Sequence, residues 1–105
     1  NEQKYLMEVK GCTLEIDGIG YFPDAPTIRG VKHLRELIGA QKKGYRCMAA
    51  FVIQMEGIRE VRPNISTHPE FARVWEDARA AGVTILALLC RVGRGSLEVV
   101  EERVL

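Results

Sequence analysis

Apolar and polar residues alternate through the first part of the chain, and an alternation with a period of two is typical of β-strands. It predicts a first strand over residues 5–10 and a second extended segment over residues 13–22. Gly18, Ile19 and Gly20 supply turn residues within that segment, so it is expected to be a strand pair or a meander. The chain is therefore predicted to open with antiparallel β-structure.

The next segment has its apolar residues at the spacing of a helix. They fall on one arc, which is expected to pack on a sheet: Val31, Leu34, Leu37 and Ile38. Asp24 and Thr27 are both good N-cap residues, so the helix is expected to begin between them. It is expected to run to Lys43, because Gly44 then stands where a C-terminal cap belongs.

Two runs that are almost continuously apolar, residues 45–55 and 83–92, predict strands that are buried on both faces. Between them, residues 57–65 are expected to form a loop with a weak strand signal at 58–61. A second helix follows and runs to Ala81. Because a strand, a helix and a strand follow one another, we expect a right-handed crossover that joins a parallel pair.

The second helix is expected to start at a capping box, in which the Thr67 hydroxyl and the Glu70 carboxylate each cover a free backbone amide. Turn residues at 93–95 precede a short final strand over residues 96–100. The predicted element order is β-β-α-β-α-β-β. The predicted class is α/β, with a mixed sheet and helices packed on it, in one domain over residues 1–105.

The composition is that of an ordinary globular domain, with a net charge of +1 and a pI of about 7.9. This charge is well below the basic excess of a domain that binds nucleic acid by charge alone, so such affinity would need a local patch or a part outside this chain. Cys12, Cys47 and Cys90 form no CxxC pair, which argues against a disulfide framework or a structural zinc site. No apolar run is long enough to span a membrane and no signal peptide is evident, so we expect a cytoplasmic protein.

Glu8 and Lys10 form the first candidate site, because side chains two apart in a strand share a face. In a phosphodiesterase, Glu8 and the carbonyl of Val9 would bind a divalent metal ion, and Lys10 would orient the attacking water or balance charge. The alternative is a solvated charge pair on a strand face, since Glu-x-Lys is common in protein sequences.

Arg29, His33 and Glu36 form a second candidate, because spacings of four and three residues place them on one helical stripe, with Lys32 on the same arc. They could contact phosphate or support catalysis, and the alternative is a solvated helix face. Asp24 is either an N-cap or a carboxylate that faces the same cleft, where it is a further candidate ligand of the metal ion.

Gln54 interrupts the apolar run near the end of a predicted strand. It could position Lys10 or a water molecule, and the alternative is an ordinary strand end that leaves the core. His68 is interpreted as an N-terminal helix residue without a chemical role.

Four blocks of the sequence together resemble a known family. They are Glu8-Val9-Lys10-Gly11-Cys12-Thr13-Leu14, the Phe22-Pro23-Asp24-Ala25-Pro26-Thr27 stretch that continues through Arg29-Gly30 and Lys32-His33-Leu34 to Glu36-Leu37, Phe51-Val52-Ile53-Gln54, and Ala80-Ala81-Gly82-Val83. Their order and their coverage of nearly the whole chain resemble the sugar fermentation stimulation protein A family of bacteria and archaea.

The resemblance implies a DNA-binding protein that has an N-terminal OB-like domain and a C-terminal domain of the restriction-endonuclease-like, PD-(D/E)xK class, to which this chain corresponds. That class has a three-layer fold with a mixed central sheet and flanking helices. Its motif falls on Glu8 and Lys10, with Val9 as the carbonyl ligand and Gln54 as an accessory residue. The implied metal ion is Mg²⁺ or Mn²⁺.

The chain departs from the class at the second metal-binding acid, which the class carries on the strand before the motif. Only seven residues precede Glu8, and Glu2 is the sole acid among them. We therefore expect weak metal binding and poor cleavage by these 105 residues alone. Two functions stay open: a Mg²⁺-dependent DNA phosphodiesterase at full length, and a non-catalytic DNA-binding regulator of sugar catabolism.

Overall fold

The computed structural model describes residues 3–12, 14–54, 57–93 and 95–105. The elements, in chain order, are β1 (Tyr5–Cys12), β2 (Leu14–Ile16), β3 (Ile19–Phe22), α1 (Ile28–Lys42), β4 (Arg46–Ile53), β5 (Glu60–Pro63), α2 (Pro69–Ala80), β6 (Thr84–Gly93) and β7 (Ser96–Val104).

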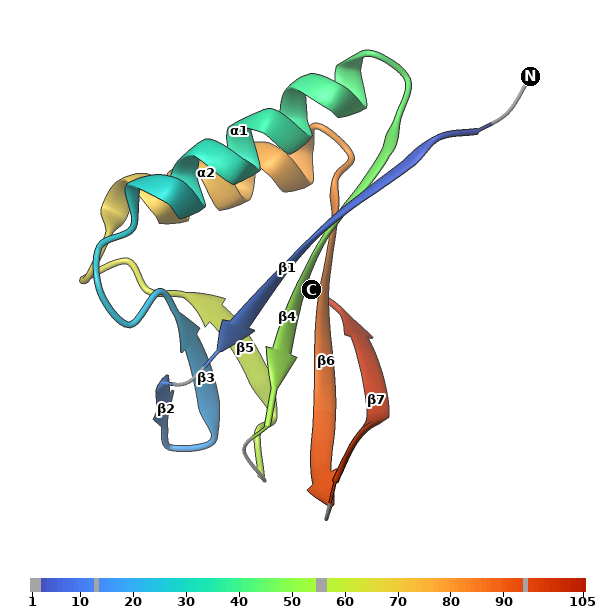
Figure 1. Ribbon diagram of the computed structural model, residues 1–105. Coiled ribbons are helices and arrows are strands. Elements are labelled where there is room, and N and C mark those ends of the chain that lie inside the picture. Colours follow the sequence, from blue (N-terminus) through green and yellow to red (C-terminus); the bar gives the residue numbers. More distant parts are fainter. Residues whose placement is uncertain (1–2, 13, 55–56, 94) are drawn as a thin grey trace.

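The larger sheet has four strands in the order β1-β4-β6-β7 (Figure 1). Strands β1, β4 and β6 are parallel to one another, and β7 is antiparallel to β6. The sheet is therefore mixed, and the predicted α/β class is confirmed. The predicted parallel pair is present as β4 and β6, with α2 in the connection between them.

The start of the chain differs from the prediction in its pairing. Strand β1 does not pair with the hairpin that follows it but lies parallel to β4, about forty residues further along the chain. The hairpin itself is present as β2 and β3, joined at Asp17 and Gly18, which both have positive φ as a tight two-residue hairpin turn requires. The alternation of apolar residues showed which segments are strands, but it contains no information on which strand pairs with which.

A second, three-stranded sheet has the order β2-β3-β5. The weak strand signal at residues 58–61 corresponds to β5, at Glu60–Pro63, which is parallel to β3. The observed element order is β-β-β-α-β-β-α-β-β. It is longer than the predicted order because the hairpin consists of two separate strands and because β5 is an additional strand. The last strand is also longer than the expected 96–100, because β7 pairs with β6 up to Val104.

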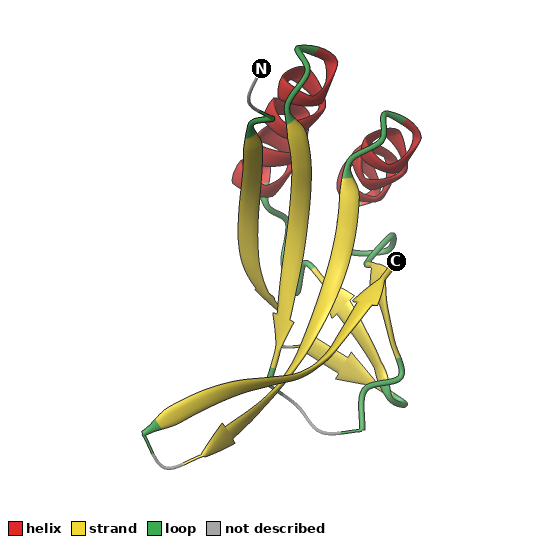
Figure 2. Cartoon of the chain, turned by 90° about the vertical axis from the view of Figure 1, so that its right-hand side faces the viewer, coloured by secondary structure: helices red, strands yellow, loops and turns green. Residues whose placement is uncertain are grey.

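Both helices lie on the same side of the four-stranded sheet (Figure 1), and the β6–β7 hairpin continues beyond their ends (Figure 2). Their buried faces meet one row of side chains from β4 and β6. Phe51 of β4 stacks on Trp75 of α2 with ring centroids 4.9 Å apart, and Phe71 meets Trp75 edge-on at 6.0 Å. This aromatic cluster holds α2 on the sheet, because buried rings contribute both area and specific geometry.

The two helices begin differently. Thr27 is the N-cap of α1, and its hydroxyl accepts a hydrogen bond of 2.9 Å from the amide of Gly30. The capping box predicted for α2 is wrong: the N-cap is His68, and no side chain caps the helix there. Instead, His68 Nδ1 accepts a hydrogen bond of 3.1 Å from the amide of Thr27, which ties the starts of the two helices together.

Among the described residues, no helix combines the length and apolar character needed to cross a membrane.

Candidate functional site

The candidate site lies where strand β1 passes beneath helix α1. Because successive side chains of a strand point to opposite faces, Glu8, Lys10 and Cys12 share the face toward the helices. In the neighbouring strand, Ala49 and Phe51 are level with Glu8 and Lys10 and are buried, so the two charged groups lie at the edge of the apolar core. Their side chains are 34% and 21% exposed.

His33 of α1 completes a compact cluster with these two residues. Lys10 Nζ lies 2.6 Å from His33 Nδ1 and 3.2 Å from Glu8 Oε1, and His33 Nδ1 lies 3.2 Å from the same Glu8 oxygen. On the helical wheel, His33 lies at the margin of the buried arc of α1, next to Leu37 and Gly30, and from this margin its side chain reaches the strand. The sequence prediction placed these three residues in two separate candidates, and the structure brings them together.

The distances determine the hydrogen bonding within the cluster. A single Nδ1 cannot both accept a proton from Lys10 and donate one to Glu8. The shorter contact is the one with Lys10, whose ammonium group has donors for both neighbours. We therefore assign Lys10 as the donor to Glu8 and to His33, with His33 neutral and its proton on Nε2. The site thus holds a carboxylate and an ammonium group side by side, with an imidazole that accepts from the ammonium.

Asp24 is exposed and follows strand β3. Burial raises the pKa of the Cys12 thiol above its ordinary value, and the negative charge of Asp24 raises it further. Cys12 is the next residue after Lys10 on the same face of β1. In the described part of the chain, no hydrogen bond or ion pair joins Asp24 to Glu8, Lys10 or His33.

The other candidates lie apart from the cluster. Glu36 is exposed and is 4.0 Å from exposed Lys32, one turn away on α1. Arg29 is exposed at the first turn of the same helix, and Gln54 is exposed just after β4. The spacing of Arg29, His33 and Glu36 predicts that they are neighbours on the helix, but it does not predict which of them faces the sheet. Of these three, only His33 contacts β1 among the described residues.

The residues predicted to hold a metal ion are oxygen donors: the Glu8 carboxylate, the Val9 carbonyl and the Asp24 carboxylate. Such donors suit a hard cation such as Mg²⁺. Within residues 3–12, 14–54, 57–93 and 95–105, no group of three or more His, Cys, Asp or Glu side chains is arranged to hold a metal ion. The donor set therefore fits the chemistry of the ion but is not a complete preformed cage.

His68 is a structurally important residue to which the sequence prediction gave no role. Its ring accepts from the backbone of Thr27, 41 residues earlier, and so fixes the start of α1, the helix that carries His33. No local pattern signals a contact over such a separation. The contact of His68 is with the backbone amide of Thr27. Among the described residues, His68 makes no hydrogen bond or ion pair with Glu8 or Lys10.

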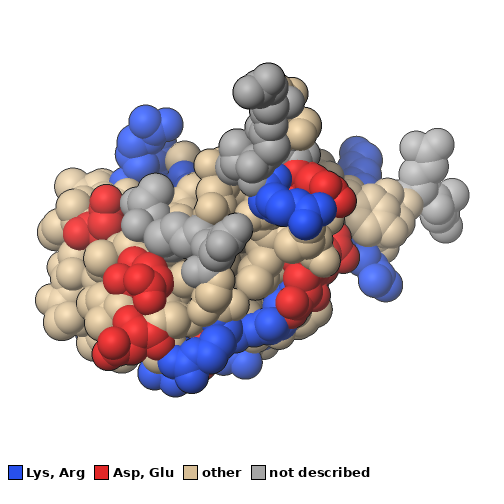
Figure 3. Space-filling model, turned by 90° about the horizontal axis from the view of Figure 1, so that it is seen from below, with Lys and Arg blue, Asp and Glu red and all other residues tan. Residues whose placement is uncertain are grey.

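Charges of both signs are interspersed on the face seen in Figure 3. Several basic side chains of the strands pair with neighbouring acids: Arg62 with Glu60, Arg91 with Glu98, and Arg103 with Glu101. These pairs lie at the surface, where they contribute little to stability. They also reduce the positive potential that a phosphate backbone would meet near these strands.

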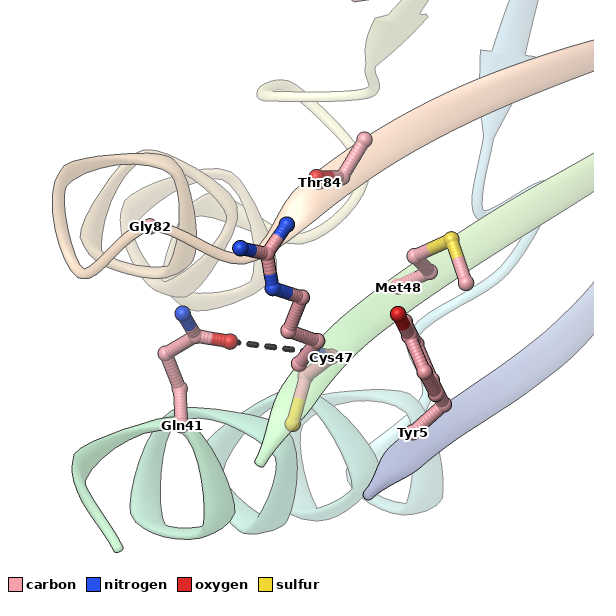
Figure 4. A pocket seen from close by; sticks show the side chains of 7 residues that line it. Tyr5, Gln41, Cys47, Met48, Gly82 and Thr84 are labelled. Atoms are coloured by element: carbon pink, nitrogen blue, oxygen red, sulfur yellow. Dashed lines mark hydrogen bonds between the residues drawn. The ribbon is translucent and has the colours of Figure 1, made fainter. Parts of the chain in front are cut away.

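A hollow of about 320 Å³ lies where the first residues of β1, β4 and β6 meet the ends of the helices (Figure 4). Tyr5, Met48 and Thr84 line it from the strands, and Gln41 and Gly82 from the helix ends. Gln41 is held in place because its Oε1 accepts a hydrogen bond of 2.9 Å from the amide of Cys47.

The fold indicates the class of protein. The mixed sheet with two helices, together with the match to a solved SfsA structure, is consistent with a restriction-endonuclease-like fold. A family model described as the sugar fermentation stimulation protein RE domain matches residues 1–96. The chain belongs to this family, as its sequence blocks predicted.

Individual relatives agree with this assignment. A sugar fermentation stimulation protein homolog of Clostridium beijerinckii is 50% identical over 97 residues, which cover 92% of this chain and 43% of the relative. The homolog of Enterococcus mundtii is 46% identical over 90 residues, with 86% and 37% covered. A solved structure described as SfsA of Pyrococcus furiosus in complex with Ca²⁺ aligns with a TM-score of 0.84 and 29% identity, over 91% of this chain and 42% of that one. The chain thus spans less than half the length of these relatives.

Proposed function

We propose that this chain is the nuclease-like part of a DNA-acting protein, in which Glu8 and Lys10 belong to a Mg²⁺-dependent phosphodiesterase site. The observation that carries the proposal is the cluster of Glu8, Lys10 and His33, with 3.2 Å between carboxylate and ammonium and 2.6 Å between ammonium and imidazole. A simple solvated charge pair needs no third group. Here an imidazole from another element holds the lysine, as a positioned catalytic group requires.

The metal ion would be held by oxygen donors from two segments. Glu8 and the carbonyl of Val9 belong to β1, and Asp24 belongs to the exposed segment between β3 and α1. Mg²⁺ or Mn²⁺ bound there would polarise the scissile phosphate and lower the pKa of a water molecule. The Pyrococcus furiosus relative was solved in complex with Ca²⁺, which supports a hard cation for this family. Both contacts of the Glu8 carboxylate use Oε1, so Oε2 is the oxygen we assign to the ion.

The remaining roles follow from position. Lys10 carries a positive charge beside the carboxylate, where it would balance the charge that develops on the phosphate. His33 accepts from Lys10 and orients it. Arg29 and Lys32 are exposed on the first turns of α1, which suits contacts to phosphates of the DNA backbone. Gln54 lies just after β4, and we assign it a supporting role at the rim. Glu36 lies beside Lys32 on the exposed surface of α1, and we assign it no part in the chemistry.

The test uses a full-length protein in which this chain replaces the matched segment of the Clostridium beijerinckii homolog. Cleavage of plasmid and single-stranded DNA is measured with Mg²⁺ or Mn²⁺, and Mn²⁺ binding is measured by calorimetry. We expect Glu8→Gln to lose both cleavage and metal binding, and Lys10→Met to lose cleavage while metal binding remains. Glu36→Gln is the matched control, because it removes a carboxylate from the exposed surface of α1.

The nuclease proposal fails if the unsubstituted protein does not cleave DNA, or if Glu8→Gln cleaves as well as Glu36→Gln. Circular dichroism identifies any variant that has lost its fold. Loss of cleavage is assigned to catalysis only in variants that are folded, and metal binding is measured on those variants.

A second function, a DNA-binding regulator without catalysis, is favoured by a specific observation: the described residues contain no group of three or more His, Cys, Asp or Glu side chains arranged to hold a metal ion. The near-neutral charge agrees with DNA affinity that comes mainly from outside this chain. In that case the full-length protein would bind DNA equally with and without Glu8→Gln, and would not cleave it.

A further inference from the structure

The segment that precedes α2 holds the chain where it enters α1. The backbone amide of Asn64 donates to the carbonyl of Phe22 at 2.8 Å, and its side-chain Nδ2 donates to the carbonyl of Pro23 at 3.0 Å. His68 adds a third hydrogen bond, in which its Nδ1 accepts from the amide of Thr27 at 3.1 Å. We call these three hydrogen bonds between residues 64–68 and 22–27 the clasp. Only the imidazole among their donors and acceptors changes its protonation between about pH 5 and pH 8.

The protonation state of His68 decides whether its hydrogen bond exists. Nδ1 accepts from an amide only while it carries no proton, so the contact requires a neutral ring with its proton on Nε2. In the imidazolium form both ring nitrogens are donors, and the Nδ1–H group would face the N–H group of Thr27. The contact is therefore made above the range in which an imidazole titrates, about pH 6.5 for an unperturbed ring, and is lost as the pH falls through it.

On its own helix, His68 faces one charged group. Its Nε2 lies 4.0 Å from Oε1 of Glu70, whose Oε2 lies 3.3 Å from the guanidinium of Arg35 on α1. Protonation would add an attraction to this carboxylate. The gain is small, because the Glu70 side chain is 55% exposed and already paired with Arg35.

On the side of α1, the charged residues nearest to Thr27 in sequence are Asp24 and Arg29, and both are exposed. Among the described residues, neither of them forms a hydrogen bond or an ion pair with His68. The His68 side chain is only 14% exposed, so water does not easily replace the acceptor that Thr27 loses. The change at Nδ1 therefore outweighs the new attraction at Nε2.

The start of α1 is coupled to the candidate site through a tightly packed first turn. Thr27 caps the helix by accepting from the amide of Gly30. A Cβ at Gly30 would lie 2.7 Å from Thr27 Cγ2 and 3.1 Å from Phe71 Cε1, so this turn packs closely against both. His33 follows Gly30 by one turn, and its Nδ1 lies 2.6 Å from Lys10 Nζ. A shift of the first turn would therefore change the contact between imidazole and ammonium.

We propose that His68 is a positioning residue for the cluster of Glu8, Lys10 and His33. Its neutral imidazole holds the start of α1, and its protonation releases this start and weakens the alignment of His33 on Lys10. The consequence for cleavage rests on the proposed function, whereas the structural part rests on the clasp and the first turn of α1.

The experiment uses the full-length protein in which this chain replaces the matched segment of the Clostridium beijerinckii homolog, labelled with ¹⁵N-threonine and ¹⁵N-histidine. NMR spectra are recorded between about pH 5 and pH 8. The Thr27 amide signal is the one lost in Thr27→Ser, and the His33 ring signals are those lost in His33→Gln. His68→Ala removes the acceptor. His68→Asn is the matched variant, because its Oδ1 takes the place of Nδ1 and does not titrate, and Glu70→Gln removes the neighbouring carboxylate.

We expect the Thr27 amide proton of the unsubstituted protein to move upfield as the pH falls, and its protection from exchange to drop about tenfold, as for the loss of one hydrogen bond. This transition should be absent in His68→Asn and retained in Glu70→Gln. His68→Ala should show the acid form at every pH. At about pH 8, where imidazoles are neutral, the His33 ring of His68→Ala should lose the pattern of a single tautomer.

The proposal is overturned if the Thr27 signal does not respond to pH, or if His68→Asn or Glu70→Gln reverses these expectations. It is also overturned if the His33 ring is the same with and without His68→Ala. If His68→Ala does not fold, the comparison of His68→Asn with the unsubstituted protein still decides the role of Nδ1.

Cleavage provides a separate reading of the same variants. We expect kcat to fall on the acid side more steeply in the unsubstituted protein than in His68→Asn, and His68→Asn to restore the kcat that His68→Ala loses. Equal acid limbs in an active enzyme would contradict the positioning role. A protein that cleaves no DNA would refute the proposed function, and the NMR spectra would still test the clasp.

Discussion

Phe51 connects the core to the candidate site, and its truncation gives the sharpest test of the packing. The ring is 1% exposed, and it lies between Phe22 at 5.1 Å and Trp75 at 4.9 Å, measured between ring centroids. Phe51 is also the direct neighbour of Lys10 across the β1–β4 pair, so it supports the strand position from which the ammonium projects.

We expect Phe51→Ala to cost about 4 kcal/mol, within the range of roughly 3–5 kcal/mol for removal of a buried aromatic ring. Two aromatic contacts, each contributing roughly 0.5–1.5 kcal/mol beyond buried area, are lost within that figure. With a urea dependence of about 2 kcal/mol per molar, typical of a small domain, the unfolding midpoint should fall by about 2 M. Such a loss is a large share of the roughly 5–15 kcal/mol that stabilises a domain.

The assay is urea unfolding followed by fluorescence, which reports directly on this contact because Trp75 is the single tryptophan of the chain. Val52→Ala is the matched control, since Val52 lies next on the same strand but its side chain is on the face away from the helices, where it is only half-buried. If Phe51→Ala costs no more than Val52→Ala, the assignment of the two faces of β4 is wrong.

Two further predictions concern the helix start and the cysteines. Thr27→Ala should destabilise the domain by about 1 kcal/mol, because the Gly30 amide loses its acceptor, whereas Thr27→Ser should not, and a Tm measurement decides between them. Burial raises the pKa of both the Cys12 and the Cys47 thiol above the ordinary 9.0, so the folded state retains these protons to higher pH than the unfolded state. The stability should therefore be unaffected below pH 9 and fall as the pH rises above it, and Cys47→Ala should flatten that fall in a series of urea titrations; an unchanged slope would contradict this account.

The sequence predicted the elements better than their partners. The apolar runs that became β4 and β6, and the buried stripe of α1, were predictable because burial imposes a local period on the chain. The parallel pairing of β1 with β4 was not, since it joins segments about forty residues apart and leaves no local signature. The same holds for β5, whose four residues are too few for a clear period.

The candidate site was predictable in part for the same reason. The spacing of Glu8 and Lys10 placed them on one face of a strand, and the helical stripe included His33. Whether His33, Arg29 or Glu36 turns toward that strand depends on how α1 sits on the sheet, which is set by distant contacts such as the one between His68 and Thr27. The capping box failed because Thr67 precedes the true N-cap by one residue.

Strand β1 is an edge strand of the four-stranded sheet, and β4 is its only partner within that sheet among the described residues. The positions of Glu8 and Lys10 therefore depend on a single ladder of backbone hydrogen bonds, while the aromatic core lies on β4 and the helices. Local opening of β1 would dismantle the carboxylate and ammonium pair at a lower free energy than global unfolding. The integrity of the site is thus a separate quantity from the stability of the domain, and amide exchange of β1 relative to β4 measures it.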